Sequence, residues 1–299
     1  MSYRLIRLGG WLINLIPLAL ARLLSRPIGF FLFVILARQR KLCLDNLRKA
    51  YGSEKSEREI RRIAIGSFAY LVEFMVEWFR LPMFAAEPGR YFGEENAAAV
   101  HEALKRGKGA IVIASHCGNQ EVMALLAGYF LPVPGASSVY ALARPVKNRA
   151  LYEFTLRSRG LTGLRSIDKN GGVRPVLELL KKNNIVCMLI DQRVGEGSVE
   201  VNFFGRSALT SSLPAVAALR YDTPVFYLFL KRTPEGRYVM TMESAPIVRT
   251  GDLSHDLLAN TQQFNDRVEA VIREKPSRWL WMHDRWRARH GFKISRHKS

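Results

Sequence analysis

His116 and Glu121 lie five positions apart and have the two side-chain types that can activate a hydroxyl group. An imidazole can take the proton of a hydroxyl, and a carboxylate beside it can hold the ring in the tautomer that leaves one nitrogen free. In such a pair the nucleophile is supplied by the substrate. His116 is therefore a candidate general base, and Glu121 is a candidate acid that orients it.

The position of this pair along the chain favours a binding crevice. The apolar run GAIVIAS at 109–115 is typical of a buried strand and ends directly before His116. In open α/β sheets, ligands bind beyond the carboxyl ends of the strands. A separation of five on one regular helix would put the two side chains on different faces, so His116 must precede the helix, and Gly118 must permit a tight turn.

Two further candidates also follow apolar runs. Asp191 comes directly after IVCMLI at 185–190 and could orient His116 in place of Glu121. Arg144 follows a predicted strand and precedes a proline, where its rigid and always charged guanidinium could bind a substrate phosphate or a thioester oxyanion.

A third group lies in the sequence FFGR. Phe204 is predicted to line an acyl chain, Gly205 to allow a close approach of the backbone, and Arg206 to bind a phosphate. A hydrolase would instead need a nucleophile in the protein. Cys117 adjoins His116, but neighbouring side chains usually point apart, and the chain contains no G-x-S-x-G sequence.

The elements that position these residues alternate between short apolar runs and amphipathic segments. This alternation predicts an α/β fold with a mostly parallel sheet flanked by helices. A capping box at Ser56–Glu59 predicts the start of a long helix that ends before Pro82. The strands are expected at 109–115, 137–143, 184–190, 223–229 and 238–243, and the helices at 118–130, 148–160, 171–183, 211–221 and about 254–274.

The N-terminal segment, 1–50, is both apolar and basic. Its two apolar runs, Trp11–Leu24 and Pro27–Ala37, are each shorter than the roughly 20 residues of a spanning helix. They predict either one tilted span or a helical hairpin within one leaflet, and a buried helix pair is the alternative. The rest, 51–299, is expected to be one domain with a basic, aromatic C-terminal tail, whose tryptophans suit a membrane interface.

The net charge of +19 favours a polyanionic partner, which could be nucleic acid, an anionic membrane or a phosphorylated substrate. The three cysteines form no CxxC pair, which argues against a disulfide framework and a zinc finger and suits a reducing compartment. The chemistry of a base and an anion-binding group requires neither a metal nor a redox cofactor.

Five blocks resemble those of a known family. They are HCGNQE at 116–121, ARPVKN at 143–148, DQRVGEGSVEVNFFGR at 191–206, TPV at 223–225 and RWLWMHDRWR at 278–287. In this order they are similar to the blocks of the lysophospholipid acyltransferase superfamily. Within it they resemble most the lipid A biosynthesis acyltransferases of the Kdo-lipid A lauroyl or myristoyl type.

The resemblance implies a glycerolipid acyltransferase-like fold and an O-acyltransferase activity with an HX4E motif. A fatty acyl chain would pass from an acyl-carrier-protein or coenzyme A thioester to a hydroxyl of a lipid A precursor, with His116 as general base. The enzyme would act at the cytoplasmic face of the bacterial inner membrane.

Two other functions are weighed. The same transfer could use a lysophospholipid, a glycolipid or an aminolipid as acceptor. A non-catalytic protein that binds nucleic acid or anionic membrane would fit the charge, but the chain has no recognised nucleic-acid motif. That reading also leaves the strand-end residues His116, Arg144 and Asp191 unexplained.

Overall fold

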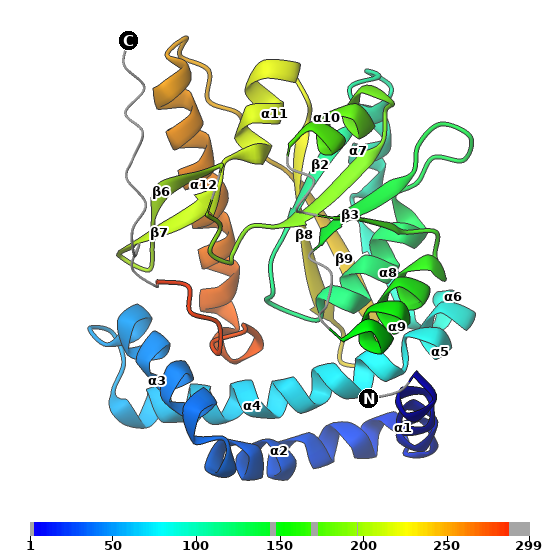
Figure 1. Ribbon diagram of the computed structural model, residues 1–299, viewed down its shortest axis with the longest axis vertical. Helices are drawn as coiled ribbons and strands as arrows, with labels where there is room; N and C mark the ends of the chain where they lie inside the picture. Colours follow the sequence, from blue (N-terminus) through cyan, green and yellow to red (C-terminus); the bar gives the residue numbers. More distant parts are fainter. Residues whose placement is uncertain (1–2, 144–147, 169–172, 196, 287–299) are drawn as a thin grey trace.

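A seven-stranded sheet forms the centre of the computed structural model (Figure 1), which describes residues 3–143, 148–168, 173–195 and 197–286. The strand order is β1-β9-β8-β2-β5-β3-β4. From β8 to β4 all neighbours are parallel, whereas β9 runs antiparallel to β8 and β1 runs parallel to β9. The predicted mostly parallel sheet is confirmed. The strands are β1 Phe92–Glu95, β2 Ala110–Ala114, β3 Val139–Ala143, β4 Arg165–Asp168, β5 Ile185–Leu189, β8 Val225–Arg232 and β9 Tyr238–Ser244.

Helices cover both faces of the sheet, and this explains why the central strands are continuous apolar runs. All five residues of β2 are buried: Ile111 and Ile113 face one core cluster, and Val112 faces the other. The first cluster includes α10 Arg174–Lys181, α11 Leu213–Tyr221 and α12 Leu253–Glu274. The second includes α5 Leu81–Ala86, α7 Ala97–Leu104 and α8 Gln120–Phe130, with α9 Arg149–Gly160 beside α8.

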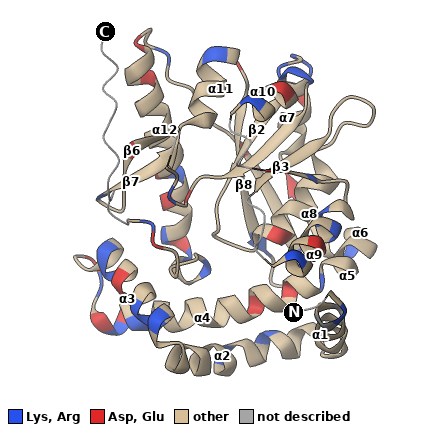
Figure 2. Ribbon diagram, in the orientation of Figure 1, with Lys and Arg blue, Asp and Glu red and all other residues tan. Residues whose placement is uncertain are grey.

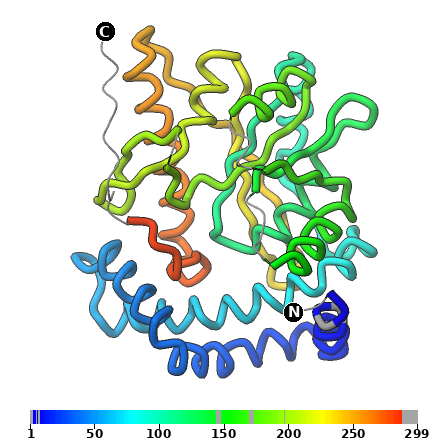
Figure 3. Tube along the Cα trace, viewed as in Figure 1, coloured from blue at the N-terminus to red at the C-terminus, as the bar shows by residue number. Residues whose placement is uncertain are grey.

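The long helix α4, Glu57–Phe79, lies across the carboxyl ends of the parallel strands (Figure 1). It begins with the predicted capping box, in which the Glu59 carboxylate accepts from the backbone N–H of Ser56 and the Ser56 hydroxyl accepts from that of Glu59. It ends before Pro82, as predicted. Figure 3 shows two distant segments beside α4, namely the N-terminal helix α2 and the C-terminal segment that contains the 3-10 turn η2, Pro276–Arg278.

The helix α2, Leu18–Ile35, continues through Pro27, so the chain makes no hairpin turn at this proline. The chain turns instead on either side of this helix, between α1 Tyr3–Leu15 and α2 and again before α3 Ala37–Tyr51. One stripe of α2, which includes Ala21 and Phe33, is buried against α4. At Gly29 an added Cβ would lie 2.3 Å from the backbone of Ala69, so only glycine permits this close approach.

The outer side of α1 and α2 exposes large apolar side chains. In the described part of the chain, α2 is the one helix long and apolar enough to cross a membrane, and 22% of it is buried. Figure 2 shows few charges on α1 and α2 and a gathering of basic residues on α3. The exposed apolar residues of this surface are Leu8, Trp11, Leu12, Leu15, Ile16, Leu20, Leu23, Leu24, Ile28, Phe30, Phe31, Val34 and Ile35.

Several elements were not predicted from the sequence. The short strands β1 and β4 lie at the two edges of the sheet. A separate hairpin is formed by β6 Ser198–Phe203 and β7 Arg206–Ser211, which pair antiparallel. The helices α3, α5, α7 and α6, Pro88–Tyr91, were not predicted either.

Candidate active site

His116 follows β2, and its imidazole is held by the carboxylate of Asp191. Its Nδ1 lies 2.8 Å from Asp191 Oδ1, and its backbone N–H donates to Oδ2 at 2.7 Å. The two residues meet because β2 and β5 are parallel neighbours with Ala114 opposite Leu189, so both strands end at one edge. Asp191 is fully buried, and 14% of the His116 side chain is exposed.

The second ring nitrogen of His116 faces the amide of Gln192, with 3.1 Å between the two nitrogens. An amide N–H can donate only to an unprotonated ring nitrogen, so these contacts fit the tautomer with the proton on Nδ1. The lone pair on Nε2 is then available to a hydroxyl that takes the place of the amide. An imidazole held in this way can accept a proton from that hydroxyl.

Asp191 is also bonded by the indole of Trp279, whose Nε1 donates to Oδ2 at 2.6 Å. Burial alone would raise the pKa of Asp191, but the adjacent His116 and the hydrogen bonds from His116 and Trp279 outweigh it and lower the pKa below its ordinary value. The carboxylate is therefore ionised at neutral pH and can accept the hydrogen bond from Nδ1 of the ring.

Glu121 lies in the first turn of α8, as predicted, but its carboxylate is bonded to Arg159 of α9. The two oxygens accept from Nη2 and Nε at 2.8 and 2.9 Å, and this bidentate pair is largely buried. Of the two acids weighed as partners for the imidazole, Asp191 is the one hydrogen-bonded to it. The interaction expected between Glu121 and His116 is not among the described hydrogen bonds.

A cavity of about 310 Å³ begins at the imidazole and extends between α8 and the sheet. His116, Gln192, Arg193 and His283 form one polar part of its wall, and the Glu121–Arg159 pair forms another. The remainder is mainly apolar, with several alanines whose small side chains leave the space open. The apolar lining consists of Ala114, Met123, Ala124, Ala127, Ala141, Leu142, Ala143, Leu164, Cys187, Met188, Leu189 and Leu228.

The FFGR sequence lies away from this cavity, at the turn between β6 and β7. Phe204 is 4% exposed, and its ring packs edge-on against Trp281. Gly205 has a φ of 70°, which the turn requires, and Arg206 donates to the backbone carbonyl of Lys49. None of these residues is among the side chains that line the described cavity, so the structure does not bring the FFGR sequence into the site around His116.

Other predictions have different outcomes. Arg144 lies outside the described residues.

Trp279 and Trp281 are 2% and 0% exposed, so the expected interfacial position is wrong for them. Cys117 is 7% exposed, and burial raises the pKa of its thiol to about 12, which disfavours a thiolate nucleophile. The described residues contain no group of three His, Cys, Asp or Glu side chains that could hold a metal ion.

A sequence model of the bacterial lipid A biosynthesis acyltransferases matches residues 3–288. The chain belongs to this family. The match includes the N-terminal helices as well as the sheet, so the apolar surface of α1 and α2 lies within the region that defines the lipid A biosynthesis acyltransferases.

Individual relatives are named for an acceptor other than a lipid A precursor. The chain is 27% identical over 251 residues to a phosphatidylinositol mannoside acyltransferase of Mycolicibacterium smegmatis (strain ATCC 700084 / mc(2)155), which covers 81% of this chain and 77% of the relative. It is 28% identical over 191 residues to a protein of the same name from Mycobacterium tuberculosis (strain ATCC 25618 / H37Rv), which covers 62% of this chain and 57% of the relative.

Several residues of the site were missed by sequence reasoning. No sequence motif marks Arg159 as a site residue, and Gln192 is marked only by its place in the block at 191–206. Trp279 and His283 belong to the closing aromatic block, which was interpreted as a membrane-interface segment. Burial lowers the pKa of His283, which lies in the wall of the cavity.

Proposed function

We propose that this protein is a membrane-bound O-acyltransferase that moves a fatty acyl chain from a thioester to a hydroxyl of a phosphorylated glycolipid. The observation that supports this proposal most strongly is the hydrogen-bonded His116–Asp191 pair at the start of an apolar cavity. An acyl chain that enters the cavity places its carbonyl carbon next to the imidazole. Family membership supports the same reaction class.

In the proposed mechanism, His116 is the general base and Asp191 orients it. Nε2 takes the proton of the acceptor hydroxyl as the oxygen attacks the thioester carbonyl, and Asp191 stabilises the imidazolium that forms. When the tetrahedral intermediate collapses, the C–S bond breaks and the thiolate leaves with the proton from the ring. The products are the acylated lipid and the free thiol of the carrier.

The substrate phosphate and the oxyanion need positive groups. Arg144 remains our proposed anion-binding residue on the strength of its sequence position at a strand end. Phe204, Gly205 and Arg206 are now proposed only as a structural turn that anchors the closing aromatic segment, because Phe204 packs on Trp281. Neither role requires a metal.

The acceptor is the finer part of the proposal. The sequence predicts a lipid A precursor first, with a lysophospholipid, a glycolipid or an aminolipid as the alternative. The relatives named phosphatidylinositol mannoside acyltransferases favour the glycolipid. Both acceptors present sugar hydroxyls close to phosphate, which suits the net charge of +19.

We also propose that the apolar surface of α1 and α2 rests in the cytoplasmic leaflet of the bacterial inner membrane, with basic side chains at the headgroups. Because α4 brings this surface beneath the carboxyl ends of the strands, the active site faces the same leaflet that supplies the lipid acceptor (Figure 1). An acyl-carrier-protein or coenzyme A thioester would arrive from the cytoplasm.

The test supplies the purified protein in detergent with a labelled acyl thioester and one acceptor at a time: a phosphatidylinositol mannoside, a lipid A precursor or a lysophospholipid. We expect transfer to the mannoside, and loss of that transfer in a folded His116→Ala variant. Transfer only to the lipid A precursor would restore the first expectation. No transfer to any acceptor, or transfer undiminished in the variant, would overturn the proposed reaction.

The cavity predicts a change in acyl-chain preference for Ala127→Leu. Ala127 lies two turns along α8 from Gln120 and lines the cavity at a distance from the imidazole. A leucine adds three carbons there, so we expect the preferred acyl chain to shorten by about three methylene groups. Competition among thioesters of different chain lengths measures the preference.

Ala124→Leu, one turn nearer to His116, provides the comparison for this prediction. It should shorten the preferred chain further or block transfer. An unchanged preference in both variants would show that the acyl chain lies elsewhere.

A further inference from the structure

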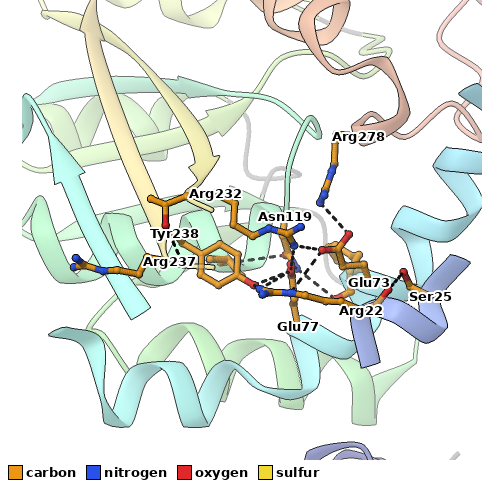
Figure 4. A network of polar contacts seen from close by, with 12 residues as sticks. Arg22, Ser25, Glu73, Glu77, Asn119, Arg232, Arg237, Tyr238 and Arg278 are labelled. Carbon is orange, nitrogen blue, oxygen red and sulfur yellow. Dashed lines mark hydrogen bonds and ion pairs between the residues drawn. The ribbon is translucent and has the colours of Figure 1, made fainter. Parts of the chain in front are cut away.

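A buried polar network contacts the loop before α8 (Figure 4). The side-chain amide of Asn119 donates to Glu77 Oε2 at 3.0 Å. Its carbonyl oxygen then accepts from two backbone N–H groups at the start of α8, at 3.0 and 3.3 Å, and caps the helix. The same amide also donates to the backbone carbonyl of Phe74 at 3.3 Å, so Glu77 and this carbonyl together determine which way the amide of Asn119 faces. That cap sets the chain direction between His116 and Glu121.

Glu77 shares its buried position with a second acid. Glu73, one turn earlier on α4, is 7% exposed, and Glu77 is 2% exposed. Burial and the neighbouring Glu73 raise the pKa of Glu77. Arg232 contacts both carboxylates, Arg278 lies 3.1 Å from Glu73, and the hydroxyl of Tyr238 donates to Glu77 at 2.7 Å.

The remaining cation of this network comes from α2. Arg22 Nη2 lies 3.7 Å from Glu77 Oε1 and donates to the hydroxyl of Tyr238 at 2.8 Å, and Arg22 Nε lies 3.8 Å from Glu73. Figure 4 shows the side chain of Arg22 reaching from its helix into the network. Its side chain is only 19% exposed, although much of the outer side of α2 is exposed. The charge is therefore directed toward the domain and not toward the membrane surface.

We propose that Arg22 is a positioning residue for acyl transfer. It acts through Glu77 and Asn119 to hold the loop between β2 and α8, which contains His116. The position of this loop therefore depends on the packing of α2 against α4. This inference rests on the proposed function. The charge of Arg22, together with that of Arg232, favours the ionised form of Glu77, and an ionised carboxylate is the stronger acceptor for the amide of Asn119 that caps α8. Loss of that charge leaves one buried carboxylate less compensated.

The experiment compares Arg22→Gln with Arg26→Gln in the full chain, in detergent, with the acceptor that wild type uses. Arg26 lies one turn further along the same helix and is exposed, so it controls for the change in charge. We expect kcat of Arg22→Gln to fall by about tenfold or more with KM nearly unchanged, and Arg26→Gln to match wild type. Binding to vesicles of zwitterionic and anionic lipid should be equal for the two variants.

A double variant separates positioning from misfolding. Glu77→Gln removes the charge that Arg22 balances, yet its amide oxygen can still accept from Asn119. We therefore expect Arg22→Gln/Glu77→Gln to recover much of the lost kcat, which independent effects cannot produce. The loss of kcat in Arg22→Gln alone should also become smaller as pH rises, because a higher pH ionises Glu77 again. The other charged or titratable groups around Glu77 are Glu73, Arg232, Arg278, Tyr238 and Tyr70.

The inference is overturned if Arg22→Gln retains the kcat of Arg26→Gln, or if the losses in the single variants multiply in the double variant. In either case an active wild type leaves the proposed reaction intact. An inactive wild type refutes the proposed function itself, and the two failures are thus distinguishable.

Discussion

Asp191→Asn should lower kcat by about 10³–10⁴-fold while leaving the protein folded. Asp191 Oδ2 accepts from both the His116 backbone and the Trp279 indole, so the single oxygen of an asparagine will occupy that position. Its amide NH₂ then faces Nδ1 of His116 and requires that nitrogen to be unprotonated. The ring is held in the opposite tautomer, with the proton on Nε2, and it cannot act as a base. Single-turnover transfer kinetics measure the loss.

Glu121→Gln is the matched comparison, because both changes replace a buried carboxylate by its amide. We expect a much smaller effect on kcat, since the Glu121 carboxylate is bonded to Arg159 and not to the imidazole. Circular dichroism checks that both variants are folded. An equal loss in the two variants would assign the orienting role to Glu121 after all.

Arg159→Ala should lower the free energy of unfolding by about 3–5 kcal/mol. The change leaves the Glu121 carboxylate without its bidentate partner at a position that is 7% exposed. Urea denaturation in a fixed detergent measures the destabilisation. The double variant Glu121→Leu/Arg159→Met, which replaces the pair by apolar groups of similar volume, should recover most of the stability.

The same double variant tests whether the ion pair has a role beyond stability. If it is stable and active, the pair serves chiefly to join α8 to α9. If it is stable and inactive, the charges of the pair take part in substrate binding. A stability loss well below 3 kcal/mol in Arg159→Ala would mean that water reaches Glu121 more freely than its burial indicates.

The sequence was sufficient to place His116 and Asp191 at strand ends, because parallel strands buried on both faces are visible as short apolar runs. It was not sufficient to choose the acid that holds the ring. The H-x4-E spacing is a local pattern, whereas the partner of Glu121 lies 38 positions away and that of the His116 ring lies 75 positions away. Only strand order and helix packing bring such residues together.

The aromatic segments show a second limit of sequence reasoning. Phe204 and Trp281 were assigned to an acyl pocket and a membrane interface, but they pack against each other in the interior. Aromatic side chains favour all three environments, so their type alone does not distinguish them. The edge strands β1 and β4 are only four residues long and partly exposed, and they lack the apolar run that identifies β2.

The hydrogen bonds of Asp191 have a consequence for how the protein is made. The carboxylate receives donors from residues 116 and 279, so the three segments that meet there are spread over most of the chain. A ribosome synthesises Trp279 long after His116. Until that last donor is in place, a nascent chain has the acid and the base but not the indole that helps to fix them. Acyl transfer should therefore begin only after Trp279 has been synthesised, long after the N-terminal helices have left the ribosome.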